Sequence, residues 1–242
     1  MKSSMHVTTS ATLAALALGA LTTLGAEISD DFESYALGSN LHGQGNWAGW
    51  DNDPGAGALV SSLRAASGTQ SVRIAPGSDL VRTFSGVEGG IWNFSLKQYV
   101  PSTASGESYV ILLNKYQPGG PYDWSVQMLA DLTAGKVTSE MGYPGNELPL
   151  VRDTWVDLRF EIDFTTGTVS EYYNNQLLST HPWDDGNGVQ SLAALDLYAD
   201  SSQSGFVFYD DLHVSQVPEP STFALLGLGG LALLARRRSR RA

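Results

Sequence analysis

Two carboxylates on one predicted strand, Glu161 and Asp163, are the first residues whose types and spacing could support catalysis. Side chains two positions apart on a strand point to the same face and lie about 7 Å apart. Carboxylate pairs at a comparable separation hydrolyse glycosidic bonds. The pair could therefore belong to a glycan hydrolase or lyase; the alternative, which we favour, is that both acids are solvated on the wet face of a hairpin.

A second set of acids, Asp31, Asp210 and Asp211, could hold a metal ion. In residues 206–214 the alternation that buries the apolar side chains also points Asp210 inward. A buried carboxylate without a partner is strongly destabilising, so Asp210 needs an arginine, backbone donors or a cation. Oxygen ligands in a chain without cysteine suit a structural Ca²⁺. The alternative is that Asp210 caps a turn and Asp211 is solvated.

Aromatic side chains next to acids, in segments rich in glycine and proline, could bind carbohydrate. Such segments surround Trp50, Tyr122 and Trp183, and Asp184 follows the last of these. Aromatic rings stack on the apolar faces of sugars, and carboxylates accept hydrogen bonds from sugar hydroxyls. We predict that these four residues bind carbohydrate; the alternative is that the rings, Trp50 above all, pack against the core.

Strands must position these residues. Between residues 30 and 215 no long segment has the 3.6-residue period of a helix. From Trp155 to Phe164 apolar residues alternate with polar ones, so this strand has one buried face and one wet face. Asn174-Asn175 can form a tight turn, since asparagine tolerates positive φ. The pattern predicts a single all-β domain, an antiparallel β-sandwich or jelly roll. The other predicted strands are Leu80–Phe84, Ile91–Val100, Ser108–Lys115, Trp124–Leu129, Val169–Tyr173, Leu192–Ala199 and Gly205–Val214.

The first 26 residues have the composition of a targeting signal. Residues 1–26 carry one early positive charge, Lys2, then an uncharged apolar run from Ala11 to Leu24 that ends in small residues. This order predicts a secretory signal peptide with a helical apolar part, cleaved near Ala26. The protein is therefore expected to be exported.

The last 26 residues, 217–242, form a second candidate signal. Pro218, Glu219 and Pro220 precede an uncharged apolar segment, 222–235, and a terminal cluster of arginines. A 14-residue helix is about 21 Å long, which is shorter than the roughly 30 Å hydrocarbon core of a membrane. We expect 222–235 to be a short transmembrane helix that inserts transiently. The arginines favour the cytoplasmic side, so the domain lies outside.

The Pro-Glu-Pro triplet, the short apolar segment and the arginine cluster, in this order, resemble the PEP-CTERM sorting signal of Gram-negative bacteria. The resemblance implies export by the secretion machinery and processing by an exosortase near the triplet. It also implies a final location in the cell envelope, on the outer surface or in the extracellular polysaccharide of a biofilm. A plain single-span anchor is the alternative, and it also places the domain outside the cytoplasm.

Residues 155–178, with their two successive hairpins, look like part of a concanavalin A-like (laminin-G-like) jelly roll. The opening segment 31–47 and the closing segment 208–212 are similar to the first and last strands of such domains. The resemblance implies two stacked, curved sheets over residues 27–216, with carbohydrate or protein ligands on the concave face or the rim loops. It also implies that the chain ends lie side by side, where related folds often hold a structural calcium.

Endo-β-glucanases of this fold carry their acids on one strand as Glu-x-Asp-x-x-Glu. Glu161 and Asp163 match the first half of this motif, but Thr166 stands where the second glutamate belongs. The acid and the nucleophile of the motif are its two glutamates, so the resemblance argues against catalysis here.

The charge of the chain excludes one class of partner. The 242 residues include no cysteine and carry a formal net charge of −11. Between Glu27 and Val217 there are 8 basic and 24 acidic residues, a net charge of −16. Such a surface repels phosphate, so no nucleic acid is expected as a partner. We predict an exported, non-catalytic protein that associates with polysaccharide; the alternatives are a glycan hydrolase or lyase using Glu161 and Asp163, and a protein-adhesion module.

Overall fold

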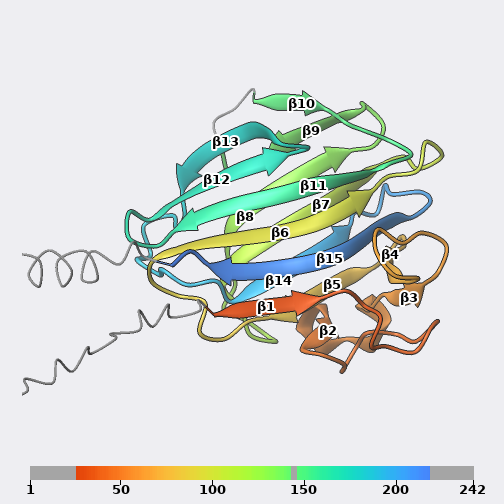
Figure 1. The fold of residues 1–242 in the computed structure, drawn as a ribbon, viewed down its shortest axis with the longest axis horizontal. Helices are drawn as coiled ribbons and strands as arrows, with labels where there is room; N and C mark the ends of the chain where they lie inside the picture. Colours follow the sequence, from red (N-terminus) through yellow and green to blue (C-terminus); the bar gives the residue numbers. More distant parts are fainter. Residues whose placement is uncertain (1–25, 143–145, 219–242) are drawn as a thin grey trace, which may run out of the picture. The chain divides into compact units, whose positions relative to one another are not determined.

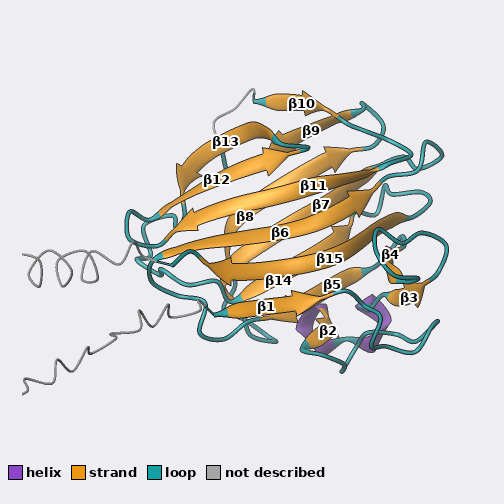
Figure 2. Ribbon diagram, viewed as in Figure 1, coloured by secondary structure: helices purple, strands orange, loops and turns teal. Residues whose placement is uncertain are grey.

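The computed structural model describes residues 26–142 and 146–218, which form an antiparallel two-sheet sandwich. Strands and the loops between them make up almost all of the described chain, with two short 3₁₀ turns after the second strand (Figure 2). The prediction of an all-β sandwich is therefore confirmed. The two sheets lie one behind the other in Figure 1, with the eight-stranded sheet in front.

The eight-stranded sheet contains both ends of the described domain. Its strands follow the order β13-β12-β11-β6-β15-β4-β3, and β1 pairs with the second half of β15 beside this path. The first and last strands are therefore neighbours, as the jelly-roll resemblance implies. The strands are β1 (Glu27–Asp30), β3 (Leu59–Ser61), β4 (Ser71–Ile74), β6 (Ile91–Tyr99), β11 (Trp155–Asp163), β12 (Thr168–Tyr173), β13 (Gln176–Pro182) and β15 (Val207–Gln216).

The seven-stranded sheet carries the candidate site. Its order is β10-β9-β8-β7-β14-β5-β2, and every pairing is antiparallel. The strand β2 leads directly into the 3₁₀ turn η1 (Trp50–Asn52) and then into η2 (Pro54–Ala56). The strands are β2 (Trp47–Gly49), β5 (Asp79–Thr83), β7 (Glu107–Lys115), β8 (Asp123–Asp131), β9 (Lys136–Ser139), β10 (Glu147–Pro149) and β14 (Ala194–Ala199).

The core lies between the sheets and follows the period-two alternation of the strands. In β11, Val156, Leu158, Phe160 and Ile162 are all buried, and the residues between them are partly or fully exposed. The turn at Asn174-Asn175 has positive φ at both residues, as predicted, and joins β12 to β13. Burial of this large apolar surface stabilises a domain that has no cysteine and hence no disulfide.

The predicted signal segments lie outside the described residues. This holds for the signal helix in 1–26, apart from Ala26, and for the apolar helix in 222–235. In residues 26–142 and 146–218 no helix is long and apolar enough to cross a membrane.

Candidate functional site

The outer face of the seven-stranded sheet, which points away from the other sheet, has an apolar floor of its own. Along β7, Val110 and Leu112 belong to the core between the sheets. Ile111 and Leu113 alternate with them and belong to a separate, smaller cluster with residues of β5 and β14. Six partly buried aromatic residues pack against this outer cluster, namely Trp50, Tyr109, Tyr116, Tyr122, Trp124 and Tyr198. An outer sheet face with its own aromatic layer is a surface suited to a ligand.

Strand register places two acids among these aromatic residues. In one row across the sheet, Tyr198 of β14 pairs with Asp79 of β5 and with Tyr109 of β7. Two residues along β14, in the next row on the same face, Asp196 pairs with Ile111. Side chains two positions apart on β14 share a face, so Tyr198 and Asp196 both point outward. Asp79 and Asp196 are thus diagonal neighbours on adjacent strands.

These side chains line a cavity of about 440 Å³, which we call the outer groove. This volume is in the range of pockets that bind small ligands or single sugar units. The groove is lined by Trp50, Asp79, Tyr109, Ile111, Trp124, Gln127, Glu140, Asp196, Tyr198 and Asp200.

Aromatic rings stand at two ends of the outer groove. Trp50 and Trp124 are stacked, with ring centroids 6.4 Å apart and planes 14° apart. Tyr109 and Tyr198 contact each other at the other end, with centroids 5.8 Å apart. Strand register puts the row of Asp196 between these ends, because Trp124 pairs with Leu113, which lies beyond Ile111 along β7. A ligand in the groove would therefore have rings on either side of the carboxyl pair.

Asp79 and Asp196 form a carboxyl pair. In each of the two groups, one oxygen receives no hydrogen bond from the rest of the described chain. Asp196 is only 3% exposed, and Oδ1 of both residues is buried and unpartnered when both are carboxylates. Burial raises the pKa of Asp196 well above its usual value, and the neighbouring charge of Asp79 adds to this rise. Burial also raises the pKa of Asp79, although a hydrogen bond from Asp196 opposes the shift. The two groups therefore share a proton, which resides on Asp196.

The outer groove is acidic throughout. Four of its lining residues are carboxylic acids: Asp79, Glu140, Asp196 and Asp200. None of the described residues that line it is lysine, arginine or histidine. The groove thus presents negative potential to a ligand and repels anions.

Asp51 fixes Trp50 at the rim of the groove. Its carboxylate accepts hydrogen bonds from the hydroxyl of Tyr122 and from the backbone N–H of Gly119, at 2.9 Å for the latter. Its own backbone N–H donates to the hydroxyl of Tyr116 at 3.1 Å. The rings of Tyr116 and Tyr122 in turn pack on Trp50, with centroids 5.0 and 4.7 Å away. The hydrogen bonds from Tyr122 and Gly119 lower the pKa of Asp51, which keeps this clamp ionised.

Of the predicted carbohydrate-binding residues, the structure brings Trp50 and Tyr122 together. Trp50 lines the outer groove and is only partly buried, so its ring is available to a ligand. Tyr122 packs behind Trp50 and is not among the lining residues. Its hydroxyl is committed to Asp51, which raises the pKa of Tyr122 to about 12. Tyr122 therefore holds Trp50 in place rather than lining the groove itself.

The prediction that Trp183 binds carbohydrate is wrong. Its side chain is fully buried, packs edge-on against Phe164 with centroids 5.4 Å apart, and donates from Nε1 to the carbonyl of Ser191 at 3.3 Å. Asp184 is committed to its own loop, where it accepts hydrogen bonds from the backbone N–H of Gly186 at 2.7 Å and from the side chain of Gln190. Neither residue lines the outer groove.

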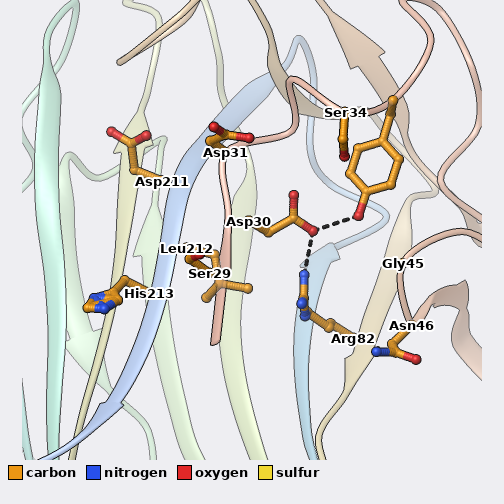
Figure 3. Close-up of a pocket in the computed structure, with 11 residues that line it drawn as sticks. Ser29, Asp30, Asp31, Ser34, Gly45, Asn46, Arg82, Asp211, Leu212 and His213 are labelled. Carbon is orange, nitrogen blue, oxygen red and sulfur yellow. Dashed lines mark hydrogen bonds and ion pairs between the residues drawn. The ribbon is translucent and has the colours of Figure 1, made fainter. Parts of the chain in front are cut away.

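A second cavity, of about 470 Å³, lies where β1 meets β15 (Figure 3). Its central group is Asp30, which forms a buried ion pair with Arg82. The carboxylate of Asp30 also accepts hydrogen bonds from the hydroxyl of Tyr35 at 2.7 Å, the indole of Trp47 at 2.9 Å and the backbone N–H of Phe32 at 3.0 Å. Every oxygen of this carboxylate is thus occupied, and the cluster joins β1 of one sheet to β5 of the other.

Two of the three predicted calcium ligands line this second cavity, but the three do not form a common cation site. Asp31 and Asp211 line it. Asp210 is fully buried, as predicted, but its partners are the backbone N–H groups of Ala66 at 2.7 Å and Asp211 at 2.8 Å. Burial raises the pKa of Asp210 to about 6. Among the described residues no three His, Cys, Asp or Glu side chains are arranged to hold a metal ion. Calcium binding therefore stays a prediction from the sequence.

Glu161 and Asp163 lie on the eight-stranded sheet, away from the outer groove. Glu161 forms an ion pair with Arg159 and accepts a hydrogen bond from the hydroxyl of Tyr172 at 3.1 Å. Asp163 accepts a hydrogen bond from the backbone N–H of Thr165 at 2.8 Å, at the turn that follows β11. Both carboxylates thus serve the hairpin, which agrees with the interpretation favoured above.

The C-terminal segment and the fold both have counterparts among known proteins. Residues 216–241 match the PEP-CTERM protein-sorting motif. The chain carries a PEP-CTERM sorting signal. This signal implies exosortase-dependent export and sorting to the cell envelope or surface. Of its central triplet, only Pro218 lies within the described residues.

The sandwich resembles solved structures at low sequence identity. The cellulose-induced protein Cip1 matches with a TM-score of 0.50 and 16% identity, over 78% of this chain and 97% of that chain. An endo-β-1,4-glucuronan lyase from the fungus Trichoderma reesei matches with a TM-score of 0.50 and 12% identity, over 81% of this chain and 96% of that chain. A sialidase matches with a TM-score of 0.52 and 11% identity, over 80% of this chain and 18% of that chain. No curated protein matches the sequence. These likenesses establish the fold, in agreement with a concanavalin A-like jelly roll.

Proposed function

We propose that this protein is an exported, non-catalytic surface or extracellular-matrix protein of a Gram-negative bacterium that binds polysaccharide in the outer groove. The sorting signal supports delivery beyond the cytoplasm. The observation that carries the binding proposal is the stacked pair of Trp50 and Trp124 in one groove with the carboxyl groups of Asp79 and Asp196. Indole rings offer apolar faces to sugar rings, and carboxyl groups bind the polar groups at the ring edges.

The arrangement of carboxyl groups supports binding rather than hydrolysis. Hydrolysis of glycosides uses two carboxyl groups about 5 Å or more apart, one on each side of the scissile bond. Asp79 and Asp196 are hydrogen-bonded to each other, which leaves no room for a sugar carbon between them. Glu161 and Asp163 are occupied by Arg159 and by a turn. A hydrolase or lyase acting through Glu161 would lose reducing-sugar release in Glu161→Gln.

The test is retention of the full-length protein by immobilised polysaccharides in affinity electrophoresis. We expect Trp50→Ala and Trp124→Ala each to weaken retention about tenfold, because stacking on one ring contributes about 1 kcal/mol or more. The matched control is Trp155→Ala, since Trp155 packs on Tyr99 on the eight-stranded sheet, outside the groove. Equal loss in all three variants, or no retention by any polysaccharide, would contradict the proposal. A protein-adhesion module would instead retain a protein partner from envelope extracts independently of Trp50.

A further inference from the structure

The charge of the outer groove selects a class of glycan. We propose that the groove binds a polysaccharide with free amino groups, of the glucosamine type, and seats one ammonium group against Asp79 and Asp196. This inference rests on the proposed function, since it names the glycan that the same groove takes.

The fold leaves the carboxyl pair without a positively charged partner among the described residues that line the groove. Asp196 is 97% removed from solvent but lines the groove, and apart from Asp79 no group of the described chain pairs with its carboxyl group. Apart from Asp196, the same holds for the carboxyl group of Asp79. An ammonium group carries three N–H donors and a positive charge, so from the groove it can donate hydrogen bonds to the pair and compensate its negative charge. Charge-assisted hydrogen bonds of this kind are roughly twice as strong as neutral ones.

The groups that face the pair add negative charge and no positive charge. From β14 and its following turn come Tyr198 and Asp200, from β7 Tyr109, and from the segment after β9 Glu140. Tyr116 and Asp51 face the pair from the rim and interact with it electrostatically. No lysine, arginine or histidine is among the described residues lining the groove.

This set of groups discriminates between glycan classes. A polyuronate would bring its own carboxylates into a groove that already holds four acids, and like charges repel. A neutral glycan could donate hydroxyl hydrogens but would leave the charge of the groove uncompensated. An amino glycan supplies both donors and charge. The indoles of Trp50 and Trp124 add favourable contacts to a nearby cation and to the sugar ring.

A metal ion is the other way to compensate such a groove. It needs several oxygen ligands within coordination distance. The described residues contain no group of three or more His, Cys, Asp and Glu side chains in such an arrangement. The amino group therefore fits the groove better than a divalent cation.

The experiment compares four hexasaccharides of matched length by isothermal titration calorimetry on the full-length protein. They are oligomers of glucosamine, N-acetylglucosamine, glucose with β-1,4 links, and glucuronic acid. We expect glucosamine to bind at least about tenfold more tightly than the two neutral oligomers, and glucuronate not to bind. The N-acetyl oligomer isolates the effect of the charge, because it differs from glucosamine only in its capped amine.

Two variants with the same change in charge separate the groove from the acidic surface in general. Asp79→Asn removes the carboxylate that carries the charge of the pair, and we expect it to lower glucosamine affinity about tenfold. Asp157→Asn removes an exposed carboxylate that pairs with Lys97 on the eight-stranded sheet, and we expect it to leave the affinity unchanged. Melting curves of both variants check that each is folded.

The possible outcomes are distinct. If glucosamine and neutral oligomers bind equally and Trp50→Ala weakens both, the amine inference is overturned and the proposed function stands. If Asp157→Asn weakens glucosamine binding as much as Asp79→Asn, the attraction is a property of the whole surface and the inference is overturned. If none of the four oligomers binds but immobilised polysaccharides still retain the protein, the amine inference is overturned and the proposed function stands.

Discussion

Each of the two cavities of this sandwich contains a buried aspartate, but one aspartate faces an arginine and the other faces a second acid. Asp30, 9% exposed, faces Arg82, Tyr35 and Trp47, and each of these donates to its carboxylate. Asp196, 3% exposed, faces a second acid, Asp79, and has no cationic partner among the described residues. A buried charge that is fully paired belongs to the architecture, whereas a pair of acids left to share one proton is available to a ligand.

One strand supplies both environments. On β5, Arg82 points into the interior and reaches Asp30 on β1 of the opposite sheet. Asp79, three positions earlier on the same strand, points to the outer face and reaches Asp196. Because the side chains of a strand alternate between faces, an odd spacing sends these two charges to opposite sides of the sheet. The positive charge of Arg82 is thus compensated in the interior by Asp30, whereas the negative charge of Asp79 faces the outer groove.

The largest predicted effect is on the buried ion pair of Asp30 and Arg82 beside the second cavity. Arg82→Met leaves the carboxylate of Asp30 buried without its ion-pair partner, and we expect a loss of about 3–5 kcal/mol in the free energy of unfolding. Urea denaturation of the full-length protein measures it. Asp196→Asn, in contrast, should change that free energy by no more than about 1 kcal/mol, because the amide can still donate to Asp79.

Two controls test this contrast. The double variant Asp30→Asn, Arg82→Met should recover part of the lost stability, since it removes the stranded charge. If Arg82→Met costs less than about 1 kcal/mol, or if Asp196→Asn costs as much as Arg82→Met, the distinction between an architectural and an available carboxylate is lost.

The sequence predicts the strands of both sites better than the sites themselves. Short runs of strand-forming residues between turn residues located the strands that became β5 and β14. The meeting of Asp79 with Asp196 depends on which strands pair and in what register, and a single sequence does not encode that locally. The signal available was an acid at the edge of one apolar strand, Asp79, and another within an apolar strand, Asp196.

Aromatic residues show the same limit of prediction from a single sequence, because their burial depends on tertiary packing. Trp183 stands between a proline and two acids, which is typical of an exposed loop, but its ring fills a space beside Phe164 at the edge of the core. Tyr109 and Tyr198 alternate with core residues on their strands and therefore resemble packing residues, but they line the outer groove. Short strands such as β2 and β10, with three residues each, are too brief to show a period.

The second predicted effect is on ligand binding in the outer groove and depends on pH. Burial raises the pKa of both Asp79 and Asp196, so the pair takes up its remaining proton at a higher pH than an ordinary aspartate does. A neutral pair no longer attracts an ammonium group. We therefore expect glucosamine-oligomer affinity to fall about tenfold between about pH 6 and pH 4, where the amine itself stays protonated.

Asp51, Asp200 and the tyrosines around the groove do not mimic this titration. The pKa values of Asp51 and Asp200 are lowered, chiefly by hydrogen bonds from the Tyr122 hydroxyl and the Ser202 backbone N–H, respectively. Both therefore remain ionised longer than the pair. Tyr109, Tyr116 and Tyr198 stay neutral throughout, since their pKa values are raised from an already high range. A pH profile that is unchanged in Asp79→Asn would show that other carboxylates hold the ligand.

The smallest expected effect is that of calcium on the stability of the region around the second cavity. The sequence-based expectation is that Ca²⁺ raises the melting temperature by several degrees, because an ion that binds only the folded state stabilises it. The backbone N–H groups of Ala66 and Asp211 already satisfy Asp210, and Arg82 already compensates Asp30. This geometry predicts that melting curves in EDTA and in excess Ca²⁺ coincide within about 1 °C. A rise that Asp31→Asn or Asp211→Asn abolishes would instead assign these exposed acids to an ion, and the second cavity would then also be a ligand site.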